Sequence, residues 1–416
     1  MKKRLLCFTM LLTVTISAIT FTNNVKAATK WNTSKSVTKE ENGIKYSAYL
    51  TEDGKESWIY QIKLSKKITK LTLPKEINQA KLTRVGFGKE LYNKGEDEDA
   101  YQNLFGDTIE PWHNCYGDLS NDDKNKQTIE TVAIPSTVNQ LEIATFSGMK
   151  KLKSVVIPEQ TASVPAYTFA KCSALSKVTF SKNMNEIDST AFVKSNQVKT
   201  FSCPKANKTF AVKKGMLTTR SGKTLVLVPN KMKKLTIPSS VKEIKANALN
   251  GSQATSIVIP KSVKKIGAKA LESKKITKVS LSSKNKTYKM ANNCIYRKSN
   301  GTLTAVLVKT KKITIPSKVK VIDDTVSVMG KIGTKNQVHI PKSVKKVVED
   351  WMFFGDSATV YFHGTKPPVI VSKFKGNEFT ALPIFNKVYV PKKAKKTYIK
   401  WAKDRDGLEW HDLHTF

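Results

Sequence analysis

A short step of an apolar residue followed by Pro recurs along this chain and constrains its fold more than any other feature. Most consecutive steps lie 22 to 25 residues apart. A fixed period of this length is typical of stacked repeats, so we expect about ten copies of one short unit. With variants that lack Pro, the steps are Leu73-Pro74, Ile134-Pro135, Ile157-Pro158, Phe180-Ser181, Cys203-Pro204, Ile237-Pro238, Ile259-Pro260, Leu281-Ser282, Ile315-Pro316, Ile340-Pro341, Phe362-His363 and Val390-Pro391.

The pattern around each step predicts a β-rich unit. Apolar residues alternate before it, as at Val155 and Ile157, which is typical of a strand with one buried face. Pro has no N–H and therefore suits the end of that strand. Apolar residues recur three and six positions after Pro, as at Val241 and Ile244, and a small residue later precedes Phe or Leu. One unit cannot bury these positions alone, so neighbouring units must stack into a solenoid.

Two of the spacings are 34 residues, from Pro204 to Pro238 and from Ser282 to Pro316. Both begin with a similar motif, Asn207 to Phe210 and Asn285 to Tyr288, and both contain a Gly turn flanked by apolar runs. This pattern predicts a β-hairpin added to one rung, near 205–233 and again near 283–311.

The repeat resembles the BspA-like (type 5, treponemal) leucine-rich repeats of bacterial surface proteins. The resemblance is most complete from Val155 to Leu175, which includes Phe169 and Cys172, and extends over 68–403 except for 92–127. Leu271 and Trp351 depart from the Phe position. The resemblance implies a leucine-rich-repeat solenoid of about ten rungs with hairpin inserts and terminal caps. It also implies an extracellular or cell-surface role, often adhesion to host matrix or other cells.

The N-terminus predicts export. A basic start precedes an apolar run from Leu5 to Phe21, and Val25-Lys26-Ala27 fits cleavage after Ala27. The alternative is that this apolar run stays in the membrane as an anchor. No later stretch approaches the ~18 apolar residues that a membrane span needs. The expected organisation is a signal peptide (1–27), an N-terminal β cap (28–67), a first repeat (68–91), an acidic insertion (92–127), the repeat solenoid (128–375) and a last repeat with a C-terminal cap (376–416).

The net charge is +39, and removal of 1–27 would leave 68 basic and 33 acidic residues, a net charge of +35. Such a charge favours polyanionic partners. Lysines recur at two repeat positions, the fourth residue after the Pro position and the fourth before it. The first column contains Lys242, Lys264, Lys320 and Lys345, and the second contains Lys177, Lys234, Lys278 and Lys312.

Equal positions of a solenoid line up, about 4.8 Å apart on adjacent rungs. We therefore expect the eight lysines to form a basic surface for an anionic polymer, such as wall teichoic acid or host glycosaminoglycan, or for a host surface protein. Nucleic acid ranks last, because aromatic residues are not interleaved with the lysines and export is expected. The alternative is a solvated surface whose lysines prevent aggregation.

No catalytic, metal or cofactor motif stands out. The five His include His411 and His414 near Asp412, and His113 lies near Cys115, but neither pair has further ligands or a third group. The remaining cysteines, Cys115, Cys172, Cys203 and Cys294, are widely spaced, so we expect buried thiols, although disulfides are possible. The acidic insertion is a candidate Ca²⁺ or partner site, but it lacks the Asp spacing of a calcium loop and is otherwise a solvated loop.

The leading hypothesis is a secreted, non-catalytic binding protein with a basic repeat surface, which uses no cofactor. One rival is a structural envelope protein retained on the producer's own anionic cell wall. Another is a secreted enzyme whose site lies on the acidic insertion. The sequence does not indicate an oligomeric state.

Overall fold

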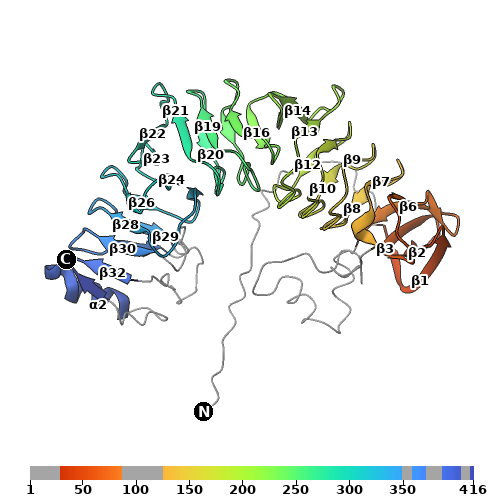
Figure 1. Cartoon of the computed structure of the whole chain (residues 1–416), viewed down its shortest axis with the longest axis horizontal. Coiled ribbons are helices and arrows are strands. Elements are labelled where there is room, and N and C mark those ends of the chain that lie inside the picture. The colour runs from red at the N-terminus through yellow and green to blue at the C-terminus, as the bar shows by residue number, and fades with distance from the viewer. Residues whose placement is uncertain (1–28, 87–124, 349–357, 372–386, 404–412) are drawn as a thin grey trace, which may run out of the picture.

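A computed structural model describes residues 29–86, 125–348, 358–371, 387–403 and 413–416. In these residues the chain forms a stack of β-rich turns that curves into an arch, with the N-terminal sheet at one end and the last turns at the other (Figure 1). The predicted β-rich solenoid is confirmed. Twelve strands lead into the twelve steps, so the solenoid has about twelve turns where the sequence suggested about ten.

The strand that leads into each step, the first strand of its turn, pairs in parallel with the first strands of the neighbouring turns. Val178 pairs with Val155 on one side and with Phe201 on the other, so apolar residues stack on apolar residues. The first strands form three sheets. These contain β4 (Lys70–Thr72), β7 (Thr131–Ala133), β9 (Ser154–Val156), β11 (Lys177–Thr179) and β13 (Thr200–Ser202); then β17 (Lys234–Thr236), β19 (Ser256–Ile259) and β21 (Lys278–Leu281); then β25 (Lys312–Thr314), β28 (Gln337–Ile340), β30 (Thr359–Phe362), β32 (Lys387–Val390) and the added β33 (Leu413–Thr415).

A shorter second strand follows the step in most turns, and these strands also pair in parallel from turn to turn. Ile244 pairs with Ile266, and both side chains are buried. Each turn of the solenoid therefore has two sheet faces around one core. The second strands are β8 (Gln140–Leu141), β10 (Ser163–Val164), β12 (Glu186–Ile187), β18 (Glu243–Ile244), β20 (Lys265–Ile266), β26 (Val321–Ile322), β29 (Lys346–Val348) and β31 (Val369–Val371), and a further strand, β27 (Ser327–Met329), follows β26.

Both predicted hairpins are present. β14 (Phe210–Lys213) and β15 (Met216–Thr219) pair antiparallel, as do β22 (Tyr288–Ala291) and β23 (Cys294–Arg297). A third strand, β16 (Thr224–Leu227) or β24 (Leu303–Leu307), then pairs in parallel with the next turn, on β18 or β27. The sheets of first strands are interrupted at these two places, between β13 and β17 and between β21 and β25.

A buried Asn begins each hairpin at a position that is Val in other turns. The Asn285 Nδ2 group donates to the carbonyls of Pro260 (3.2 Å) and Val263 (3.0 Å) in the preceding turn. Its Oδ1 accepts from the amides of Thr287 (2.9 Å) and Tyr288 (2.8 Å). Asn207 makes the same four contacts one hairpin earlier. The amide side chain therefore satisfies backbone groups where the chain leaves the regular turn.

The core is a set of side-chain columns that run along the stack. Phe146, Phe169 and Phe192 are buried, and their rings stack at 5.5 and 5.7 Å between centroids. Leu249 and Leu271 occupy the same repeat position in later turns and are also buried. The residue before each of these is small and buried, because adjacent turns approach closely there.

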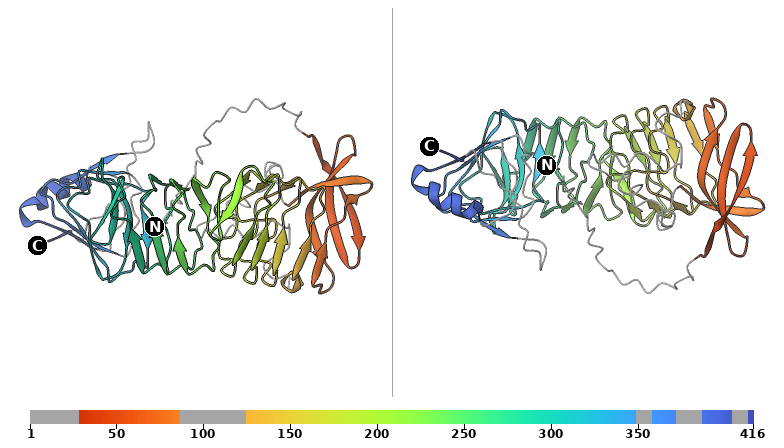
Figure 2. Two further views of the ribbon diagram at one scale, coloured as in Figure 1. Left: turned by 90° about the horizontal axis from the view of Figure 1, so that it is seen from above. Right: turned by 90° about the horizontal axis from the view of Figure 1, so that it is seen from below.

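The N-terminal sheet begins with three strands in the region where a β cap was expected, 28–67. β2 (Ile44–Thr51) and β3 (Glu56–Leu64) form an antiparallel pair around an acidic turn, and β1 (Trp31–Glu41) pairs with β2. On the other side, β6 (Ala80–Val85) pairs in parallel with β3 and with β8, and β5 (Glu76–Ile77) pairs with β6. The sheet is therefore continuous with the first turns (Figure 2).

The C-terminal turns carry a short 3₁₀ helix, η3 (Lys392–Ala394), and the helix α2 (Lys395–Lys403), while η2 (Lys126–Thr128) precedes β7. Tyr398 of α2 is buried and donates from its hydroxyl to the Gly364 carbonyl at 3.1 Å. No helix in the described residues is both long and apolar enough to cross a bilayer. The predicted signal peptide and nearly all of the acidic insertion lie outside the described residues.

Candidate functional site

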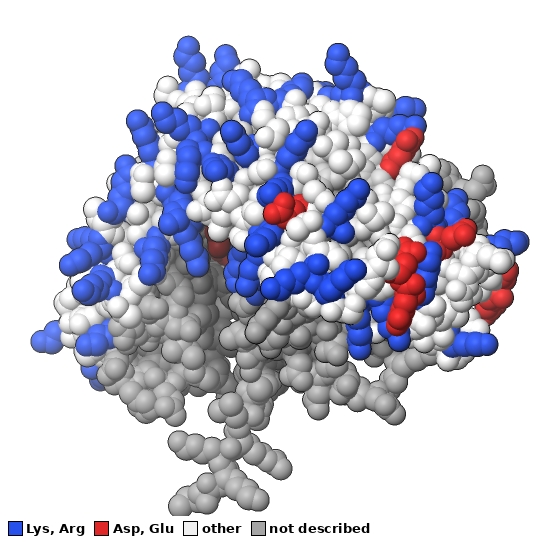
Figure 3. Space-filling model, turned by 45° about the vertical axis from the view of Figure 1, so that its right-hand side comes forward, with Lys and Arg blue, Asp and Glu red and all other residues white. Residues whose placement is uncertain are grey.

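Charge is distributed unevenly along the arch. Residues 29–86 contain 12 basic and 6 acidic residues, whereas residues 244–348 contain 23 basic residues and three acids, Glu272, Asp323 and Asp324. Basic side chains are scattered over the described part of the face in Figure 3, and most of the acidic ones lie toward the right, where Figure 1 places the N-terminal sheet. The later turns therefore have far more positive charge than their own acids can neutralise.

The lysines four residues after the Pro position form two groups on adjacent turns. The Lys264 amide donates to the Lys242 carbonyl at 2.7 Å, and the Lys345 amide donates to the Lys320 carbonyl at 2.9 Å. All four side chains are exposed. The second hairpin lies between the two groups. In this column, the structure brings predicted site residues together as consecutive rungs.

One lysine of this column was missed by the repeat pattern. The Lys242 amide donates to the Lys223 carbonyl at 2.7 Å, so Lys223 extends the first group by one rung. Lys223 is exposed and lies in the turn that leads into β16. Its Ser221-Gly222 turn belongs to the hairpin, and no Pro stands four residues before Lys223, so the repeat spacing does not predict this lysine. The first group therefore contains Lys223, Lys242 and Lys264.

The lysines four residues before the Pro position do not lie on adjacent rungs. Lys234 and Lys278 both pair with Ser256, which separates them by a full strand. Lys177 lies between Ser154 and Thr200, and Lys312 pairs with Gln337. All four side chains are exposed. The expected alignment on adjacent rungs is therefore wrong for this column, because the four lysines lie in three sheets and only Lys234 and Lys278 share one, with Ser256 between them.

Several lysines elsewhere already have acidic partners. Lys45 contacts Glu40 at 3.4 Å, Lys153 contacts Glu130 at 2.6 Å, and Lys182 pairs with Glu159. Next to the first lysine group, Lys265 contacts Glu243 at 2.8 Å. These exposed pairs add little stability. They do reduce the positive potential near them, whereas none of the eight predicted lysines has an ion pair of this kind within the described residues.

Two histidines that the sequence left separate are brought together. The Nδ1 atom of His339 lies 2.9 Å from Nε2 of His363, a hydrogen-bond distance. Burial and the nearby Lys312 lower the pKa of His339 to about 4, and the same two causes lower the pKa of His363. Both imidazoles are therefore neutral at neutral pH.

The three described cysteines are free thiols. Cys172 and Cys294 are buried and Cys203 is partly buried. Burial raises the pKa of Cys294 to about 12 and also raises that of Cys203, although Arg220 opposes the second shift. Cys203 and Cys294 are therefore protonated at neutral pH, and all three thiols belong to the packing of the turns. Cys115 lies outside the described residues.

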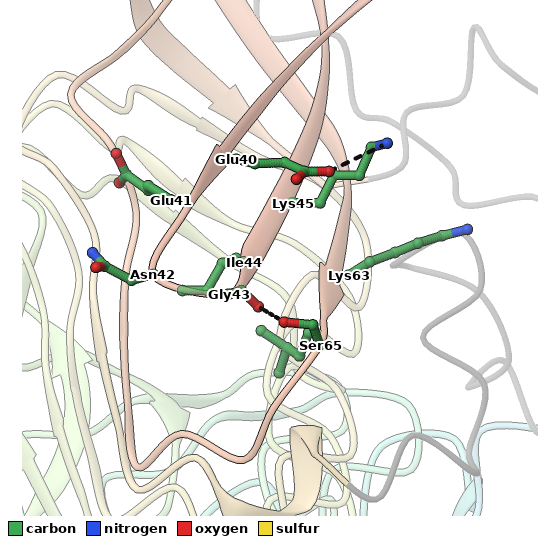
Figure 4. A pocket seen from close by; sticks show the side chains of 9 residues that line it. Glu40, Glu41, Asn42, Gly43, Ile44, Lys45, Lys63 and Ser65 are labelled. Atoms are coloured by element: carbon green, nitrogen blue, oxygen red, sulfur yellow. Dashed lines mark hydrogen bonds and ion pairs between the residues drawn. The ribbon is translucent and has the colours of Figure 1, made fainter.

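An open hollow of about 410 Å³ lies beside the β1–β2 turn (Figure 4). Of its charged groups, Lys45 pairs with Glu40 and Glu41 pairs with Lys39 outside the hollow, while the Ser65 hydroxyl donates to the Gly43 carbonyl at 2.9 Å. Across the described ranges, no three His, Cys, Asp or Glu side chains converge as a metal site would require. The hollow therefore offers no set of polar groups that point toward one ligand. His113 and His411 fall outside these ranges.

A family profile described as "BspA type Leucine rich repeat region" matches the chain in six copies, over residues 124–214 and 229–359. These ranges make up more than half of the sequence. The chain belongs to the BspA-type leucine-rich repeat family. The resemblance seen in the repeat motif is therefore confirmed. A comparison with curated proteins finds no match.

Several solved structures are similar to this BspA-type protein along most of its length. A leucine-rich cell surface protein of Faecalibacterium prausnitzii is 13% identical, with 82% of this chain and 96% of that chain covered and a TM-score of 0.37. A leucine-rich repeat protein of Eubacterium ventriosum is 13% identical, with 86% and 94% covered and a TM-score of 0.39. The pneumococcal vaccine antigen PcpA is 15% identical, with 91% and 98% covered and a TM-score of 0.38.

Proposed function

We propose that this protein is a secreted, non-catalytic binding protein that attaches to anionic polymers through the lysines of its later turns. The polymer would be a glycosaminoglycan of a host surface or matrix, or the teichoic acid of a cell wall. Membership of the BspA-type leucine-rich repeat family, which the repeat motif itself resembles, supports a surface role.

The observation that carries the proposal is the excess of exposed lysine over acid in residues 244–348, together with consecutive lysines on adjacent turns. Ammonium groups held one strand spacing apart, about 4.8 Å, repel one another. An anionic polymer that lies along the turns relieves this repulsion at several points at once. Many weak contacts along one chain would then add to a useful affinity.

The test is binding of the full chain to heparin and to poly(glycerol phosphate) over a series of salt concentrations. Replacing Lys242, Lys264, Lys320 and Lys345 by Gln should move elution from heparin to lower salt and flatten the dependence of affinity on salt, because fewer counterions are released.

A matched control removes the same number of charges elsewhere. Lys39, Lys45, Lys55 and Lys182 each already pair with an acid, so their replacement by Gln should change binding much less. Equal effects of the two fourfold variants would show that only net charge matters, and the proposed surface would be wrong. Binding that does not respond to salt would contradict the function itself.

The rival of an envelope protein makes a different prediction for cell walls. A protein held on the producer's own wall should bind walls that contain teichoic acid and lose this binding after the teichoic acid is extracted. Strong heparin binding with no wall binding would favour the host surface instead.

A further inference from the structure

In the C-terminal sheet, one position on the outer face is occupied by an aromatic ring in each of the last four strands. His339, Tyr361, Tyr389 and His414 pair in register on β28, β30, β32 and β33. Their ring centroids follow at 4.4, 4.6 and 4.9 Å, with interplanar angles of 6°, 12° and 25°. We call these four residues the aromatic ladder. The same position in all earlier first strands is small or β-branched: Thr72, Ala133, Val156, Thr179, Ser202, Thr236, Val258, Ser280 and Thr314.

The ladder is not required by the core. Alternate residues of a strand face opposite sides, and the ladder's neighbours Val338, Val360, Val388 and Leu413 are the ones that enter the hydrophobic core. Earlier turns stack just as regularly with Thr or Ser in the ladder position. Cross-strand aromatic pairs do add stability, but the solenoid does not need them to form.

Basic and polar side chains border the ladder on the same sheet face. Two positions earlier on the strands stand Lys312, Gln337, Thr359 and Lys387, in register with one another. On the other side, the His363 ring lies 5.1 Å from the ring of Phe416, which is about half exposed. Lysines therefore stand at the first and last of these four positions, on β25 and β32, and the described strands of this sheet carry no acidic residue. The residue two before His414 is Asp412, which lies outside the described residues.

The geometry of the rings restricts what they can bind. Each ring stands on edge, because strand spacing and ring stacking have nearly the same repeat. The faces are covered by neighbours, so the ladder is not a stacking platform of the kind that holds bases. It presents ring edges, which carry the positive part of the aromatic quadrupole.

The polar tips of the ladder have unused hydrogen-bonding capacity. Within the described residues, neither the Tyr361 nor the Tyr389 hydroxyl has a hydrogen-bond partner, and both side chains are partly exposed. Nε2 of His339 and Nε2 of His414 are also unpartnered there, but both atoms are buried, so the two hydroxyls are the groups open to a ligand. Burial raises the pKa of Tyr361, so that its hydroxyl remains a donor. Donors and positive ring edges both favour an anion.

We infer that the aromatic ladder is the short-range contact for the anionic polymer, with the Tyr361 and Tyr389 hydroxyls donating to its anionic oxygens between Lys312 and Lys387. This inference rests on the proposed function. The lysines attract the polymer over a distance, and the ladder fixes where it lies. The shared chemistry is a flexible chain with closely spaced sulfate, carboxylate or phosphate groups.

The test uses the full chain with both tyrosines replaced by Phe, Y361F and Y389F, which removes the hydroxyls and keeps the rings. Affinity for heparin or poly(glycerol phosphate) at one fixed salt should fall about tenfold, because hydrogen bonds to charged acceptors are lost. The slope of affinity against salt should not change, because no charge is removed. The polymer whose affinity falls identifies the source of the ligand.

A matched control is the double variant Y49F and Y60F, which alters the other stacked tyrosine pair of the molecule's described part, with centroids 4.4 Å apart. This control should bind as the unaltered protein does. Nitration of tyrosine in the unaltered protein gives a second readout, in which bound polymer should protect Tyr361 and Tyr389 but not Tyr60. Salt-dependent binding with no loss in the ladder variant and no protection would overturn this inference alone. Binding without salt dependence would overturn the proposed function instead.

Discussion

At the scale of single residues, one buried Asn at the start of each hairpin allows the backbone to leave the regular turn. Asn207 and Asn285 are each 1% exposed and take the place of an inward Val. Each binds two carbonyls of the turn before and two amides of its own turn. A buried polar group of this kind is stable only because all its partners are present.

Replacement of Asn285 by Val would restore the apolar residue usual at this position but leave two amides and two carbonyls without their partner. We expect the free energy of unfolding of this region to fall by about 2 kcal/mol or more. Urea denaturation of the full chain would measure the loss. Asn183→Ala is the control, because exposed Asn183 makes a single bond to the Glu159 carbonyl, at 3.0 Å. An N285V protein as stable as the control would show that the bonds are not needed.

At the scale of elements, a turn is stable because its columns continue into the next turn. Phe169 lies between Phe146 and Phe192 with nearly parallel rings, at 12° and 8°. The column accepts Leu at Leu249 and Leu271, so the position selects an apolar side chain that fills the space rather than an aromatic ring as such.

Phe169→Ala should reduce stability by about 3–5 kcal/mol, because it opens a cavity between two turns. Phe169→Leu should cost less than about 1.5 kcal/mol, because the repeat already packs Leu at this position. The urea midpoints of the two variants, compared with that of the unaltered chain, give the test. Equal losses would mean that stacking of the rings, rather than the filled volume, stabilises the column.

At the scale of the whole molecule, the two hairpins divide the solenoid's packing as well as its sheets. The buried residues fall into three clusters, which run from Ile44 to Leu227, from Met216 to Met329 and from Cys294 to Leu413. Neighbouring clusters meet at the hairpin strands β15 and β16 and again at β23 and β24. Stability in such arrays is a sum of turn and interface terms, so the weakest interfaces set the cooperative units.

We therefore expect unfolding in blocks bounded by the hairpins. In hydrogen exchange followed by mass spectrometry, Phe169→Ala should reduce protection in β9, β11 and β13 while β28, β30 and β32 keep theirs. A uniform loss of protection along the whole chain would show one cooperative unit and contradict the division. The unaltered chain at the same urea concentration is the reference.

The sequence by itself determined the turn and its interior. Local pattern predicts the strand before Ile157-Pro158, the inward Val and Ile positions and the two 34-residue hairpins. It does so because every turn must bury apolar side chains at the same positions. The expected number of about ten turns was low, because each of the twelve steps seen in the sequence, variant steps such as Phe362-His363 included, ends a strand of the stack. The strand β1 carries no repeat signal and was missed.

Only the tertiary structure decided which side chains are neighbours across turns. Lys242 and Lys264 lie on adjacent rungs whereas Ser256 separates Lys234 from Lys278, since pairing depends on register between strands that are 22 or more residues apart. The sequence did not predict the aromatic ladder, because its four residues are unevenly spaced along the chain and only the pairing of strands brings them together. Local pattern fixes which way a side chain points, and the packing of turns fixes what it meets.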